Sequence, residues 1–133
     1  MYTDRHGDHW IDEYSDILYD DLTGYTPATR EHVIAAKPAD YADAIAIAHA
    51  YLAPLDALTY VGGGADYANR AWLVAGTLDA DHVVIDTGEY GEGWEVVARM
   101  SDAAEYSRCI GGYASPAQAI AAAREFAASV GLV

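Results

Sequence analysis

The stretch from residue 71 to residue 130 constrains the fold most, because it contains several short strand patterns followed by one well-marked helix. Turns rich in Asp and Gly separate the strand patterns, and connections this short favour antiparallel neighbours. The predicted strands cover residues 71–75, 82–85, 94–98 and 106–110. The sequence therefore predicts an antiparallel meander of three to four strands.

The last helix has clear start and stop signals. Ser115 is placed to cap it, Pro116 occupies the first helical position, and Gln118 stands where a capping box requires it. Gly131 marks the end. Apolar residues then recur every three to four positions on one face, namely Ile120, Ala123, Phe126, Ala127 and Val130. We expect a helix over 116–130 that packs across one face of the sheet through Ile120, Ala123 and Phe126.

The first part of the chain has helical periodicity in two places. Residues 8–22 combine an apolar stripe with an acidic one, and a second helix opens at Pro38 and Asp40 and closes at Pro54. Residues 29–36 and 55–70 stay open between helix, strand and loop. We therefore expect one α+β domain over 1–133, with a helical part (1–54) containing two helices, followed by a part (71–133) made of the sheet and the C-terminal helix.

The pattern of strands, Gly-rich turn and Ser-Pro capped helix resembles the small strand-strand-strand-helix domains of unknown function found in many bacteria. That resemblance covers about the last fifty residues. It implies a fold and carries no activity.

Charge limits the classes of partner. The chain has 21 Asp and Glu against 7 Lys and Arg, a formal net charge of −14. Binding to DNA, RNA or an anionic membrane depends on clustered Lys and Arg, so direct binding to these is disfavoured and a basic partner is favoured. Residues 1–6 include no apolar segment and no run of eighteen apolar residues occurs, so we expect a cytoplasmic protein without a membrane span.

The acidic residues fall into two groups. Aspartates recur every four residues in 8–22 on the face opposite the apolar stripe, and no Lys or Arg lies between Arg5 and Arg30 to offset their repulsion. A second group occupies the predicted turns, those of 79–81 and 102–105 at one end of a meander and those of 89–92 at the other. The candidate partner-binding residues are Asp8, Asp12, Glu13, Asp16, Asp20, Asp79, Asp81, Glu89, Tyr90, Glu92, Asp102 and Glu105.

The sequence contains no motif that specifies a catalytic site or a metal site. His6 and His9 lie beside carboxylates but lack the His-Glu-x-x-His arrangement, so we expect no metal site there. The glycines of 62–64 lack the spacing of a phosphate-binding loop, and the other histidines, His32, His49 and His82, are isolated among apolar residues. Cys109 is the single cysteine, so an internal disulfide is excluded. We expect Cys109 to be a buried residue of a strand. We expect no enzyme activity and no cofactor.

In size, charge and lack of a catalytic motif, the chain resembles the small acidic proteins with which phages and mobile elements block CRISPR or restriction complexes, some of them DNA mimics. That resemblance implies an inhibitor that binds a basic nucleic-acid-handling protein or complex and blocks its DNA or RNA site. One alternative is a housekeeping binding or assembly module of a salt-adapted or high-GC organism. Another is a small enzyme or metal-binding protein that uses His6 and His9. Acid spread evenly over all faces favours salt adaptation, whereas acid confined to one face, with a neutral remainder, favours a basic partner.

Overall fold

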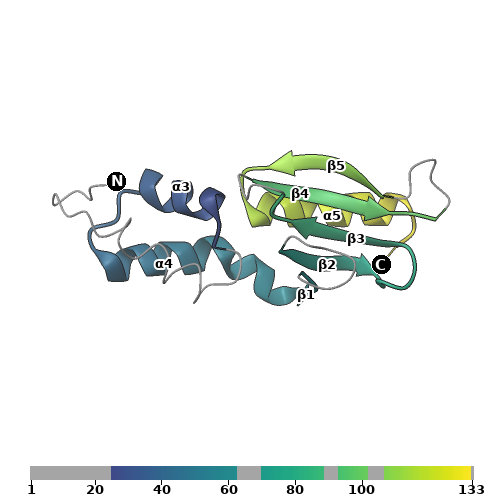
Figure 1. Cartoon of the computed structure of the whole chain (residues 1–133), viewed down its shortest axis with the longest axis horizontal. Coiled ribbons are helices and arrows are strands. Elements are labelled where there is room, and N and C mark those ends of the chain that lie inside the picture. Colours follow the sequence, from purple (N-terminus) through teal and green to yellow (C-terminus); the bar gives the residue numbers. More distant parts are fainter. Residues whose placement is uncertain (1–24, 63–69, 89–92, 102–106, 133) are drawn as a thin grey trace. The chain divides into compact units, whose positions relative to one another are not determined.

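The computed structural model describes residues 25–62, 70–88, 93–101 and 107–132 of the 133-residue chain (Figure 1). The chain divides into two compact units, Met1–Ala53 and Pro54–Val133. The first is helical where it is described, and the second holds the sheet. Each unit is considered by itself.

The helical unit contains helix α3 (Pro27–Ala35) and helix α4 (Tyr41–Leu52). Proline stands at the first position of α3, where its missing N–H breaks no helical hydrogen bond. Asp40 caps α4 by accepting a hydrogen bond from the Asp43 amide at 2.8 Å, and Asp43 in turn accepts one from the Ala39 amide at 2.8 Å. Together these bonds satisfy two backbone N–H groups at the start of α4, as a capping box does.

Small side chains form much of the core of the helical unit. The four fully buried members of this core are Tyr25, Val33, Ala44 and Ala48. Ala44 and Ala48 lie one turn apart on α4, so the backbones of α3 and α4 can approach closely. The turn between the helices passes through Lys37, whose φ of 53° lies in the left-handed region.

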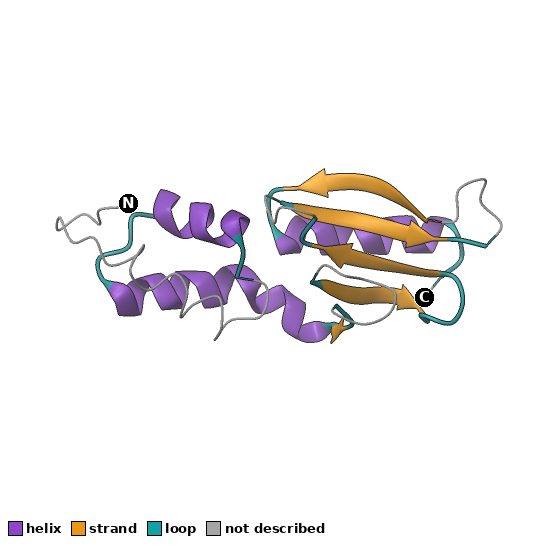
Figure 2. Ribbon diagram, viewed as in Figure 1, coloured by secondary structure: helices purple, strands orange, loops and turns teal. Residues whose placement is uncertain are grey.

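The sheet unit is a five-stranded antiparallel meander (Figure 2). Its strands follow one another in space in chain order, and a 3₁₀ helix, η1 (Ala53–Ala57), precedes the first. The strands are β1 (Thr59–Tyr60), β2 (Ala71–Gly76), β3 (His82–Asp86), β4 (Trp94–Arg99) and β5 (Ser107–Tyr113). The predicted meander is confirmed, with β1 as an additional short strand.

Helix α5 (Pro116–Ser129) contacts strands β2 to β5 and covers one face of the sheet. The Ser115 side chain accepts a hydrogen bond from the Gln118 amide at 3.2 Å, as the sequence predicts. At the other end, Gly131 has a φ of 79°, and the Leu132 amide donates to the Ala127 carbonyl at 2.8 Å. This arrangement is a Schellman motif, in which a left-handed residue closes the helix.

The packed face of α5 differs in part from the predicted one. Ala119, Ile120, Ala123 and Ala127 are buried, whereas Phe126 is half-buried and 40% of Val130 is exposed. Ile120 and Ala123 are thus confirmed in the contact, whereas Phe126 lies at its margin. Its side chain lies toward the β5 edge of the sheet, where less of the strand surface is available to cover it.

Cross-strand register separates the two faces of the sheet. Tyr113 lines a groove together with α5 side chains and pairs directly with Trp94, so both lie on the face that α5 covers. Strand alternation then places Val96 and Ala98 on that face, and all three β4 side chains are buried. The opposite face has its own apolar cluster, centred on the fully buried Ala71 and Val84 and extended by Val61, Leu73, Leu78 and Val97.

These elements confirm the α+β class, with a meander, a C-terminal helix on one face and two helices before it. Helix α4 matches the predicted second helix, although a 3₁₀ turn follows it through Pro54. The predicted helix over 8–22 lies outside the described residues. Helix α3 occupies the 29–36 segment, for which the sequence left helix and strand open.

Candidate functional site

Two of the twelve candidate partner-binding residues lie in the described part of the chain. Asp79 and Asp81 both belong to the β2–β3 turn. The other ten lie outside the described residues: Asp8, Asp12, Glu13, Asp16, Asp20, Glu89, Tyr90, Glu92, Asp102 and Glu105. His6 and His9 lie outside them as well.

At the end of the sheet that holds Asp79 and Asp81, the β2–β3 turn meets the residues that follow β4. The Asp81 carboxylate accepts a hydrogen bond from the Ser101 amide at 2.8 Å, and this bond lowers the pKa of Asp81. A shallow hollow of about 580 Å³ opens here. It is lined by Gly76, Thr77, Asp79, Ala80, Asp81, Ser101 and Leu132. Two carboxylates therefore border a concave surface near the C-terminal end of α5.

At the other end of the sheet, a second pair of carboxyl groups flanks the β3–β4 turn. Asp86 ends β3 and pairs directly with Glu95 of β4, on the face opposite α5. Asp86 is 5% exposed, and its Oδ1 accepts a hydrogen bond from the Gly88 amide at 2.8 Å. Gly88 has a φ of 69°, and a Cβ built there would stand 3.4 Å from the Glu95 carboxyl group. Glycine suits this turn for its backbone angle, and a Cβ there would only reach ordinary van der Waals contact with Glu95.

The environment of this pair favours the protonated form of Asp86. Burial, together with the neighbouring Glu95 carboxyl group, raises the pKa of Asp86 to about 6, although the hydrogen bond from Gly88 opposes the shift. Asp86 therefore exchanges its proton in the pH range in which most aspartates are fully ionised. A cation placed next to the pair would favour ionisation of both carboxyl groups and relieve their repulsion.

Cys109 lies on this same face of the sheet, opposite Val97. It is exposed, so the expectation of a buried thiol was wrong: β5 is the last strand of the sheet, and the face opposite α5 leaves this position open. Partial burial raises the pKa of the Cys109 thiol, and the charges of Glu95 and Asp86 raise it further. A raised pKa keeps the thiol protonated at neutral pH and so makes it a poor nucleophile.

Two of the three histidines in the described residues, His82 and His32, have contacts within their own unit. His82 is fully buried, with Nδ1 2.7 Å from the Ala80 carbonyl oxygen. The His32 ring stacks on Tyr51 with ring centroids 4.2 Å apart. Among the described residues, no group of three or more His, Cys, Asp or Glu side chains could hold a metal ion. No helix in that part of the chain is long and apolar enough to cross a membrane.

The negative charge of the chain is unevenly divided between segments. The described residues include nine Asp or Glu and six Lys or Arg, a formal charge of −3 out of −14. Most of the negative charge thus belongs to residues 1–24 and to the short segments 63–69, 89–92 and 102–106. Alanine occupies three of the four exposed positions of α4 and three of the seven exposed positions of α5, where Glu125 is the one exposed carboxylate.

The carboxyl pair was missed as a candidate site, although a signal for it was present in the sequence. A hairpin whose connection comprises residues 87–94 pairs Asp86 with Glu95, as the structure shows. The sequence could not show that Asp86 is buried, because burial depends on what covers that face of the sheet.

No family model, no curated protein and no solved structure matches this chain. Functional inference therefore rests on the residues of the chain itself.

Proposed function

We propose that this protein is a non-catalytic, cytoplasmic binding protein for a basic nucleic-acid-handling protein or complex, and that it blocks the DNA or RNA site of that partner. Inhibitors of CRISPR or restriction complexes are the class that it resembles in size and charge. The partner supplies Lys and Arg side chains that would otherwise contact phosphates. Carboxylates of this protein take the place of those phosphates.

The uneven division of charge supports this proposal most strongly. A salt-adapted protein carries acid over all its exposed surface, including the outer faces of its helices. Here the exposed positions of α4 and α5 include six alanines and one carboxylate, that of Glu125, and the described residues together carry a formal charge of −3. The acid is concentrated in 1–24 and in the turns of the sheet, which favours a localised role in binding.

The two ends of the sheet supply further support. Asp79 and Asp81 border a hollow at one end, and Asp86 and Glu95 lie side by side near the other. A partner cation at the second end would offset the cost of ionising the buried Asp86. Association should therefore release protons near pH 6, which isothermal titration in buffers of different ionisation enthalpy would detect.

A competition assay tests the proposal. Purified CRISPR effector and restriction complexes are loaded with labelled nucleic acid, and displacement by the protein is measured at about 0.05 M and about 0.3 M salt. We expect displacement that weakens as salt rises. We also expect it to weaken at least about tenfold when Asp8, Asp12, Asp16 and Asp20 are replaced by Asn.

A matched pair of double variants tests whether binding depends on carboxylates at one particular surface or only on the net charge of the protein. The variant with Asp79→Asn and Asp81→Asn loses the same charge as one with Glu31→Gln and Asp56→Asn, whose carboxylates are exposed in α3 and η1. We expect the first to weaken displacement and the second to match wild type. Equal displacement by all variants at both salt concentrations would contradict the proposal, and activity confined to molar salt would favour the salt-adapted alternative.

A further inference from the structure

Strand β5 forms one edge of the sheet and pairs with β4 alone among the described strands. Alternate residues of an edge strand direct their N–H and C=O groups away from the sheet, where they can pair with another chain. Seven residues at a rise of about 3.3 Å give this edge a length of about 23 Å. From Cys109 to Tyr113 the edge contains neither lysine nor proline, the residues that commonly protect such edges.

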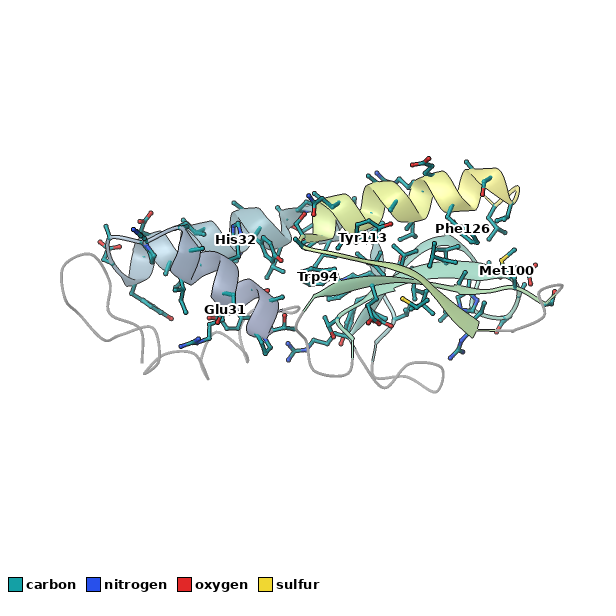
Figure 3. The ribbon with its side chains drawn as sticks, turned by 90° about the horizontal axis from the view of Figure 1, so that it is seen from above. Glu31, His32, Trp94, Met100, Tyr113 and Phe126 are labelled. Carbon is teal, nitrogen blue, oxygen red and sulfur yellow. The ribbon has the colours of Figure 1, made fainter. Side chains whose placement is uncertain are left out.

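A groove of about 320 Å³ runs beside this edge, between β5 and α5. Strand β5 contributes Ile110 and Tyr113, and α5 contributes Ala122, Glu125, Phe126 and Ser129. These helix positions are spaced by three, one and three residues, so they form a second stripe on α5, next to the buried stripe that packs on the sheet. Figure 3 shows Tyr113 and Phe126 on the side of the sheet that α5 covers.

A bulge in β5 supplies one wall of the groove. Gly111 pairs with Val96 and Cys109 pairs with Val97, so Ile110 is the extra residue on β5. An extra residue of this kind changes the direction of its side chain. Ile110 accordingly lines the groove, while Cys109 stays on the opposite face of the sheet. After the bulge, Gly112 is open, with nothing within 4 Å of a Cβ built on it.

We propose that this edge and groove bind an extended, cationic peptide segment of the partner, which adds to β5 as a sixth strand. Main-chain hydrogen bonds to β5 would supply affinity, and alternate side chains would enter the groove against Ile110, Tyr113 and Phe126. The inference rests on the proposed function, since it names the surface on which a basic partner docks.

The negative charge of the protein favours a cationic peptide segment, and not a second copy of this chain, as the occupant of the β5 edge and groove. Among the described residues that line the groove, Glu125 is the one with a charged side chain, and its carboxylate can meet an incoming segment. Two copies, each carrying a formal charge of −14, repel each other, whereas a cationic segment is attracted. A Lys or Arg side chain that enters the groove therefore lays its alkyl stem against Ile110, Tyr113 and Phe126 and its charge beside Glu125, and the apolar residues at the alternate positions face the other side of the sheet.

The test uses the full chain and a fluorescein-labelled ten-residue peptide of alternating lysine and valine, with fluorescence anisotropy as the measurement. Ala122→Arg places a cation inside the groove, and Ala121→Arg adds the same charge at an exposed position of α5 outside the lining. We expect Ala122→Arg to weaken binding at least about tenfold and Ala121→Arg to stay within about twofold of wild type. Far-UV circular dichroism checks that both variants fold.

A second probe needs no variant of the protein. The same peptide, N-methylated at alternate residues, keeps its charge and side chains but loses the donors that strand addition requires. We expect its affinity to fall at least about tenfold. If neither N-methylation nor Ala122→Arg weakens binding, this surface is the wrong one, although a basic partner would still be supported.

Two further outcomes would overturn the inference. Wild-type protein that does not bind the peptide, while it still displaces nucleic acid from a basic complex, would place the docking surface elsewhere. A dimer in sedimentation that Ala122→Arg dissociates would make a second copy the occupant of the edge. Failure of the competition assay with every complex would count against the proposed function itself, independently of the peptide result.

Discussion

The described parts of the helical unit and the sheet unit bring their elements together through different contacts. In the sheet unit the largest fully buried residues include Ile85 of β3 and Trp94 and Val96 of β4, which lie on the face that α5 covers. Trp94 and Trp72 also contact each other, with ring centroids 5.8 Å apart. In the described part of the helical unit, α4 presents the fully buried Ala44 and Ala48 to this core beside Tyr25 and Val33, and these small side chains allow α3 and α4 to approach closely.

The two units should therefore respond to opposite changes. Large side chains stabilise the sheet unit, so removing one leaves a cavity. Small side chains stabilise the helical unit, so enlarging one forces the helices apart. The following substitutions test that contrast, beginning with the largest expected effect.

Trp94→Ala should destabilise the sheet unit most. The side chain is fully buried, and its loss should cost about 3–5 kcal/mol of unfolding free energy. Urea melts followed by the fluorescence of the remaining tryptophans measure the change. Val130→Ala, at a 40% exposed position, is the control and should stay within about 0.5 kcal/mol. A loss below about 1 kcal/mol for Trp94→Ala would mean that large side chains do not dominate this unit.

Ala48→Leu should destabilise the helical unit by about 1–3 kcal/mol, because a fully buried alanine leaves no room for three more carbons. Amide hydrogen exchange in α4 reports the change in that unit. The matched control is Ala46→Leu, on the exposed face of the same helix, which should remain near wild type. If both leucines are tolerated equally, close helix packing is not what stabilises this unit.

Asp86→Asn should raise the stability of the sheet unit at neutral pH by about 1 kcal/mol, after allowance for screening by solvent. In the folded protein the pKa of Asp86 rises from 3.8 to about 6. The folded state therefore binds the proton more tightly than the unfolded state, and its advantage, complete below about pH 4, is lost as pH rises through 6.

The difference between wild type and Asp86→Asn should consequently grow from pH 4 to pH 6 and stay constant above that range. Thermal melts at a series of pH values measure it. Asp79→Asn, at an exposed position of the β2–β3 turn, serves as the control. A difference that does not vary with pH would show that Asp86 is not destabilised by burial.

Lys37→Gly should give the smallest effect, a gain of about 0.5–1 kcal/mol in the helical unit. Lys37 adopts a φ of 53°, which glycine reaches without steric cost. Lys37→Ala removes the charge but keeps the Cβ, so it should show no such gain. Equal gains from both substitutions in thermal melts would point to charge as the cause.

The sequence predicted the elements that carry local signals. Ser115 and Gln118 mark the start of α5, and Asp40 marks the start of α4, because caps act within one helical turn. Helix α3 escaped prediction because its apolar residues do not form a clear stripe: Thr29 and Val33 are its buried positions.

Features that depend on tertiary cover were predicted less well. Periodicity placed Phe126 on the packed stripe of α5, but it could not show that this position lies beside the last strand of the sheet. It likewise placed Cys109 on a strand without showing which face is covered. The burial of Asp86 could not be predicted from the sequence either, because it arises from neighbours that are distant in sequence.

The alanines on the outer faces of α4 and α5 affect the entropy of association. Ordering a lysine or glutamate side chain at an interface costs up to about 2 kcal/mol of rotamer freedom, whereas alanine has no rotamers to lose. A partner that touches these helices immobilises little besides the backbone, which is already fixed in the helix. Contacts made through α4 or α5 can therefore be small in area and still retain most of their interaction energy.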